Sequence, residues 1–131
     1  MNVGAVLEFS YLWKREAAAG ETSCRKDRPV CLALKLGRDP GAMAYFLFPI
    51  TSQPPAAGWS AFAIPQIECR RGGLYHPAWL IIDGFNQTKA DAACDLASAQ
   101  PRGAFSIAFM KAVVARIAEA HRDGRLQGVK R

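Results

Sequence analysis

The stretch PVCLALKL, residues 29–36, decides how this chain is expected to fold. It is an almost unbroken apolar run of the length of a strand, and a dense turn signal, GRDPG at residues 37–41, ends it. A second apolar and aromatic run, MAYFLFPI at residues 43–50, follows shortly after. These two runs predict two strands of a β-sheet.

Further strands and one helix are expected on either side of these runs. Residues that favour strands predict them over 3–13, 59–64 and 77–83. Later in the chain, apolar side chains recur at helical spacing, at Phe105, Phe109, Val113 and Ile117. This spacing predicts a helix over 104–122. Gly124 is expected to stop it.

Five strands and a terminal helix predict a mainly β (α+β) fold, a small, partly open barrel with a C-terminal helix that covers it. The chain has 131 residues, so a single domain over 1–131 is expected. Half of the residues are hydrophobic, which excludes a disordered protein. The net charge of +6 favours an anionic partner such as nucleic acid.

The sequence favours a cytoplasmic protein with no membrane segment. Residues 41–67 carry no charge, but four prolines and several polar side chains within them exclude a membrane-spanning helix. The first 13 residues lack the basic start of a signal peptide. The four cysteines form no CxxC pair and have no histidine at ligand spacing. We therefore expect reduced thiols, with Cys31 in the core, and neither a metal nor a cofactor.

Two local features could carry chemistry. Arg28 precedes Pro29, whose ring favours an extended Arg28, so its guanidinium would sit at a rigid strand entry. A guanidinium held there can clamp a phosphate, although a solvated cationic loop explains the same residues. Thr51 and Ser52 follow the second run, where hydroxyls can bond a phosphate oxygen or simply satisfy a turn.

A series of short motifs resembles the PemK/MazF growth-inhibitor family, the toxin halves of type II toxin–antitoxin pairs. The series runs Gly4, Tyr11 and Trp13, Gly20-Glu21, Arg28-Pro29 before the apolar strand, and Pro49-Ile50-Thr51-Ser52. RKDRP at residues 25–29 and Gly84-Phe85-Asn86 resemble a PemK-like branch. The resemblance covers roughly residues 4–87.

The resemblance implies a Src-homology-3-like barrel of the CcdB/MazF type, a homodimer and a cognate antitoxin. It also implies a metal-independent endoribonuclease that cleaves single-stranded RNA. The catalytic arginine and threonine of the family match Arg28 and Thr51. We expect substrate contacts from five further residues: Glu21, Arg25, Lys26, Ser52 and Asn86.

Two other functions stay open at this point. The chain departs from the family pattern at Ala5, Thr22 and Gly84, which favours a catalytically silent module that binds nucleic acid or protein on the same fold. A CcdB-like inhibitor that binds gyrase is the other alternative. Arg28 and Thr51 together favour the nuclease, because a gyrase-binding surface needs no such pair. The general base could be Glu21, Asp27 or a water molecule.

Overall fold

The first apolar run forms strand β2, Arg28–Leu36, in the interior of the sheet. The computed structural model describes residues 2–9, 11, 28–37, 43–56, 58–89 and 100–130. Within β2, Cys31 and Ala33 belong to one buried cluster, while Val30 and Leu32 belong to a second. Successive side chains of a strand point to opposite faces, so both faces of β2 are buried. This explains why the run is continuously apolar instead of alternating.

Neighbouring strands pair with β2 on both sides. Strand β1, Ala5–Phe9, and strand β3, Ala44–Thr51, are both antiparallel to it. β3 has two further partners: its first half pairs with β6, Gly84–Lys89, and its end pairs with β5, Trp79–Ile81. The other strands are β4, Ala61–Ala63, β7, Gly103–Ala104, and β8, Gln127–Lys130. β4 pairs with β5, β7 pairs with β1, and β8 runs parallel to β6.

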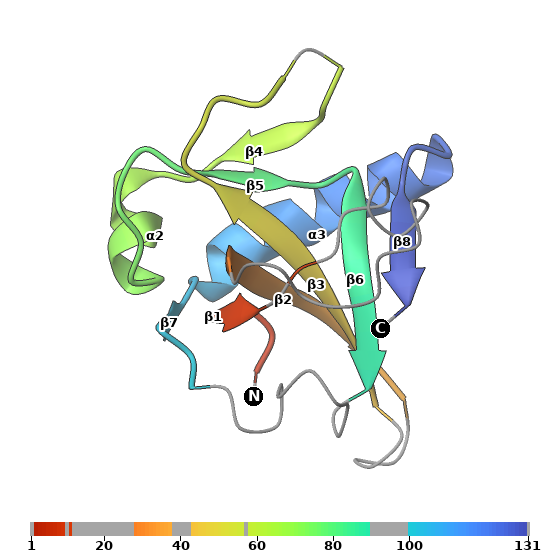
Figure 1. Cartoon of the computed structure of the whole chain (residues 1–131), viewed down its shortest axis with the longest axis horizontal. Helices are drawn as coiled ribbons and strands as arrows, with labels where there is room; N and C mark the ends of the chain where they lie inside the picture. Colours follow the sequence, from red (N-terminus) through yellow and green to blue (C-terminus); the bar gives the residue numbers. More distant parts are fainter. Residues whose placement is uncertain are drawn as a thin grey trace.

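The long helix α3, Ile107–Arg122, lies behind the sheet (Figure 1). Its buried side chains, Phe109, Met110, Val113, Ile117 and Ala120, form one stripe, and several of them join the cluster that contains Cys31. The helix begins three residues later than predicted. Gly103 and Ala104 pair with β1, and the Ser106 hydroxyl caps the helix by accepting a bond from the Phe109 N–H at 3.2 Å. Gly124, with φ of 70°, follows the end of the helix as predicted.

A short helix, α2, was not expected from the sequence. It spans Gln66–Arg71, and its last turn carries the two cationic side chains Arg70 and Arg71. Glu68 of α2 is 7% exposed, and its carboxylate accepts bonds from the N–H and the hydroxyl of Ser106 at 2.8 and 2.7 Å. The carboxylate therefore ties α2 to the positive end of α3.

The described chain is mainly β, with a mostly antiparallel, open sheet and a long C-terminal helix. The mainly β (α+β) class and the C-terminal helix agree with the prediction from the sequence. The predicted strands over 3–13, 59–64 and 77–83 contain β1, β4 and β5. β4 and β5 are shorter than expected, and residues 10, 12 and 13 of the first range lie outside the described residues. Strands β6, β7 and β8 were not predicted. In the described residues, no helix has the length and apolar character that crossing a membrane requires.

Candidate functional site

Arg28 and Thr51 lie at the same edge of the sheet. Arg28 is the first residue of β2 and Thr51 is the last residue of β3, and these two strands are antiparallel. In their register Val30 faces Pro49. Because the strands are antiparallel, the residue two positions before Val30 lies opposite the residue two positions after Pro49, which places Arg28 opposite Thr51. The strand pairing thus joins two residues that the sequence analysis had singled out for separate reasons.

Both residues line one pocket of about 490 Å³, which we call the Arg28 pocket. Its described lining consists of Arg28, Pro29, Ile50, Thr51, Ser52, Gln53, Leu74, Tyr75, Ala78 and Arg102. Two of these residues carry a guanidinium, several carry hydroxyl or amide groups, and none of the described lining residues is acidic. A pocket of this composition suits an anion such as a phosphodiester.

The Thr51 hydroxyl is oriented by the turn that follows β3. It accepts a hydrogen bond from the backbone N–H of Gln53 at 3.1 Å, and it lies 3.4 Å from the Gln53 carbonyl oxygen, to which it donates. The second bond is long and therefore weak. The hydroxyl hydrogen can turn to an incoming phosphate oxygen while the Gln53 N–H keeps the oxygen atom of Thr51 in place.

Arg28 lies half-buried beside the Tyr11 side chain. Burial raises the pKa of the Tyr11 phenol, and the positive charge of Arg28 acts in the opposite direction. The raised pKa keeps this phenol neutral at physiological pH. Tyr11 is therefore a hydrogen-bond donor near Arg28 and not a base.

Arg102 is a pocket residue that the sequence analysis missed. It comes just before β7, and its guanidinium donates to the Glu8 carboxylate of β1 in an ion pair. Its backbone N–H also bonds the carbonyl oxygen of Val6 at 2.6 Å. The pairing of β7 with β1 brings Arg102 to the pocket, and because that pairing joins residues almost a hundred positions apart, no local pattern reveals it.

The glycine that follows Arg102 permits this approach. A Cβ atom on Gly103 would lie 2.0 Å from the carbonyl oxygen of Arg71, which is backbone and cannot move aside cheaply. Gly103 therefore fixes how closely β7 can lie to the end of α2, and with it the position of Arg102.

The other predicted substrate contacts have different positions. Ser52 lines the Arg28 pocket and is exposed. Asn86 is fully buried in β6, opposite Leu47 of β3 and Val129 of β8, and does not line the Arg28 pocket. Glu21, Arg25 and Lys26 lie outside the described residues.

The two described cysteines lie in the core, away from the lining of the Arg28 pocket. Cys31 and Cys69 are buried and not in disulfides, and burial raises the pKa of both thiols. Cys24 and Cys94 lie outside the described residues. Within the described ranges, no three His, Cys, Asp or Glu side chains gather in a way that could hold a metal ion.

Comparisons with protein-family models, with curated proteins and with solved structures gave no match to this chain. The assignment of a function therefore depends on the residues of the site.

Proposed function

We propose that this protein is a PemK/MazF-like toxin, an endoribonuclease that cleaves single-stranded RNA and inhibits growth. The observation that carries the proposal is that Arg28 and Thr51 line one pocket with no described acidic residue in its lining. The motif series of the sequence also supports it. We further propose that the open sheet is a barrel of the CcdB/MazF type, and that a cognate antitoxin binds the protein.

The proposed reaction uses the RNA's own 2′-hydroxyl as the nucleophile. The 2′-oxygen bonds to phosphorus, the bond from phosphorus to the 5′-oxygen breaks, and a cyclic phosphate and a 5′-hydroxyl result. The proton of the nucleophile passes to a base, and the leaving oxygen gains a proton. Negative charge builds on the phosphate oxygens, where the guanidinium of Arg28 stabilises it and the Thr51 hydroxyl orients one oxygen.

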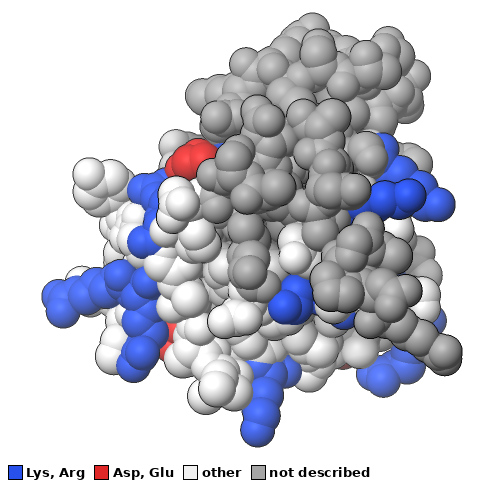
Figure 2. Space-filling view, turned by 90° about the horizontal axis from the view of Figure 1, so that it is seen from below, with Lys and Arg blue, Asp and Glu red and all other residues white. Residues whose placement is uncertain are grey.

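The charge distribution fits an RNA substrate. The chain carries a net charge of +6. On the face seen from below, Lys and Arg side chains project on several sides, and Asp and Glu occupy little of the view (Figure 2). Such a surface attracts the RNA backbone through its phosphates and makes the affinity depend on salt.

A substitution of Arg28 tests this proposal. Arg28→Lys keeps the charge but loses the planar fork of donors, so cleavage of a long single-stranded RNA should fall by about 10²–10³-fold. Arg122→Lys is the matched control, because Arg122 is exposed at the end of α3 and lines none of the described pockets. Thermal melts verify that both variants fold.

The same assay examines metal dependence. Because the proposed chemistry assigns charge stabilisation to Arg28, cleavage should continue in EDTA. A lysine variant as active as wild type, or cleavage that stops in EDTA, would refute the mechanism. RNA binding without any cleavage by the wild-type protein would favour the silent binding module instead.

A further inference from the structure

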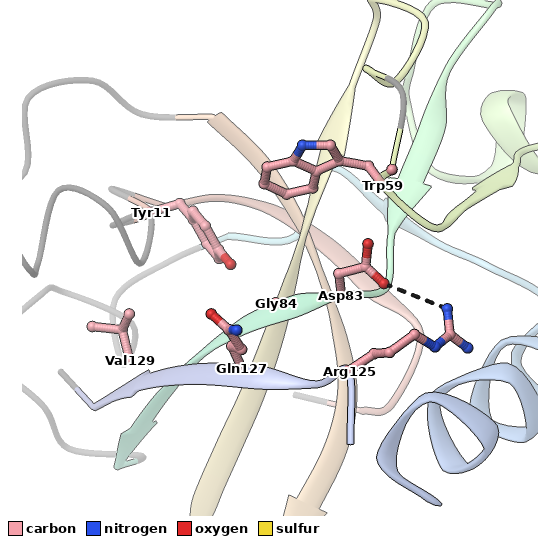
Figure 3. Close-up of a pocket in the computed structure, with 8 residues that line it drawn as sticks. Tyr11, Trp59, Asp83, Gly84, Arg125, Gln127 and Val129 are labelled. Atoms are coloured by element: carbon pink, nitrogen blue, oxygen red, sulfur yellow. Dashed lines mark ion pairs between the residues drawn. The ribbon is translucent and has the colours of Figure 1, made fainter. Parts of the chain in front are cut away.

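A second pocket, of about 370 Å³, lies where the β5–β6 junction meets β8 (Figure 3). Its described lining consists of Tyr11, Gly58, Trp59, Asp83, Gly84, Arg125, Gln127 and Val129. We call it the Asp83 pocket. The proposed phosphate chemistry uses none of its residues, although Tyr11 lies close enough to Arg28 for the two side chains to interact electrostatically.

The Asp83 carboxylate is held in place through one oxygen atom, while its other oxygen atom accepts no hydrogen bond from the described residues. Its Oδ2 atom accepts a hydrogen bond from the backbone N–H of Ser60. Its Oδ1 atom is buried and has no hydrogen-bond partner among the described residues. The Arg125 guanidinium lies 3.9 Å from Oδ1, which is an ion pair but too long for a hydrogen bond. A buried carboxylate oxygen without a hydrogen bond is costly, and a ligand with an N–H donor would satisfy it.

Arg125 is itself held in place. It donates to the Ser60 hydroxyl, and its Nη2 atom lies 3.3 Å from an oxygen of Asp123. An acceptor and a set of donors thus stand side by side at one end of the pocket, as Figure 3 shows. This pattern can read the edge of a planar heterocycle that presents donors next to an acceptor.

Trp59 supplies a flat apolar surface for such a ring. Trp59 is 44% exposed, although a large indole normally favours burial. In Figure 3 the indole, the Tyr11 hydroxyl and the Asp83 carboxylate surround the same space. Stacking on an aromatic side chain combined with hydrogen bonds to a base edge is how proteins read single-stranded RNA.

A third pocket connects the first two. It has a volume of about 210 Å³ and shares Thr51 and Gln53 with the Arg28 pocket. At its other end it shares Trp59 with the Asp83 pocket. Pro54, Pro55, Ala56 and Ile81 line the rest of the described path. An extended strand could therefore place a phosphate at Arg28 and a base of a neighbouring nucleotide at Asp83.

We propose that the Asp83 pocket binds a guanine base of the RNA substrate and so sets which sequences are cut; this inference rests on the proposed nuclease function. The guanine edge offers two adjacent N–H donors, from N1 and N2, to the two carboxylate oxygens of Asp83. Its O6 atom, next to N1, can accept from Arg125. Adenine, cytosine and uracil present no such pair of adjacent donors on that edge.

Binding of mononucleotides to the purified chain tests the pocket directly. Guanosine monophosphate should bind at least about tenfold more tightly than the adenosine, cytidine and uridine monophosphates, measured by calorimetry. Asp83→Asn should abolish this preference, because the amide replaces one acceptor by a donor. Glu119→Gln is the matched control: Glu119 is an exposed carboxylate of α3 and lines none of the described pockets, so the preference should persist.

A second variant keeps the test valid if the first variant does not fold. Should Asp83→Asn fail to fold in thermal melts, Trp59→Ala replaces it, since the half-exposed indole is less important for the core. Loss of stacking should weaken guanosine monophosphate binding by about 5- to 100-fold. Equal affinity of wild type for all four nucleotides, a guanine preference that survives in Asp83→Asn, or an unchanged affinity of Trp59→Ala for guanosine monophosphate overturns the inference.

Mapping of cleavage sites on a long RNA separates this inference from the proposed function. Wild type should cut at a fixed distance from guanines, Asp83→Asn should cut without that preference, and Arg28→Lys should hardly cut but still prefer guanosine monophosphate. Guanine binding without any cutting by wild type would refute the nuclease and leave the guanine site standing. Cutting without guanine preference would refute the guanine site and leave the nuclease standing.

Discussion

At the scale of single residues, the Thr51 hydroxyl has a role that can be separated from the shape of its side chain. Thr51→Val removes the hydroxyl and keeps the branched shape, so RNA cleavage should fall by about tenfold, the usual contribution of one hydrogen bond. Thr51→Ser retains the hydroxyl and should retain most of the activity. Cleavage rates at saturating RNA measure both. A valine variant as fast as wild type would show that Thr51 only closes the turn with Gln53.

Cys31 links the stability of the core to pH. Burial raises the pKa of its thiol to about 12, from an ordinary value near 9. The folded state holds this proton more tightly than the unfolded state, so the contribution to stability is complete below about pH 9. As the pH rises from about 9 towards 12, that contribution is lost at about 1.4 kcal/mol per pH unit.

Urea unfolding with a reductant present, between about pH 8 and 11, measures this loss. Cys31→Ala lowers the stability at every pH through the cavity it leaves, but the decline with pH should be shallower than in wild type. The slopes are the quantity to compare, because Tyr11 and Cys69 also have raised pKa values. Equal slopes in the two proteins would contradict the prediction.

At the scale of elements, the contact between α2 and α3 depends on one carboxylate. Ser106→Ala removes the helix cap and should lower the free energy of unfolding by about 0.5–2 kcal/mol. Glu68→Ala leaves the Ser106 N–H without this acceptor and should lower it by about 1–3 kcal/mol. Because the two residues share a hydrogen bond, the double variant should lose less than the sum of the two.

Urea unfolding of the four proteins forms a double-mutant cycle. Glu119→Ala, on an exposed position of α3, is the control and should change the stability by less than about 0.5 kcal/mol. Strict additivity of the Glu68 and Ser106 substitutions would mean that the observed bonds do not couple the two helices.

The elements that could be predicted from the sequence are those whose burial leaves a strong pattern. β2, β3 and α3 have long apolar runs or a helical period, and the structure confirms them. β6 has the sequence GFNQTK, and it buries the polar side chains Asn86 and Thr88, so neither alternation nor an apolar run reveals it. β8 lies in what reads as a basic tail, and its pairing with β6 is a long-range contact.

The residues of the site that could be predicted are likewise those that lie next to a strong local pattern. Arg28 and Thr51 stand beside strong strand signals, so their type and position could be inferred and the strand register then joined them. Arg102 reaches the Arg28 pocket through the pairing of β7 with β1. Asp83 and Arg125 come together at the junction of β6 and β8. No short-range rule of sequence encodes either contact.

At the scale of the whole molecule, we predict a homodimer. In the described part of the sheet, β4, β7 and β8 each pair with a single strand, and unpaired strand edges favour association. Large apolar side chains are also exposed, among them Ile67, Tyr75 and Ile107. Sedimentation at micromolar concentration should give twice the chain mass of 14.3 kDa. A single species of the chain mass would contradict the prediction.

The pocket that holds Arg28 has a consequence for the synthesis of the protein. Its lining extends from Arg28 to Arg102, and β8, which covers the outer edge of β6, comes later still in the chain. During translation the pocket cannot be completed until residue 102 has left the ribosome, however early β2 and β3 pair. A nascent chain therefore carries an unfinished site until β7 has emerged, and a nuclease built this way would spare its own transcript up to that stage of synthesis.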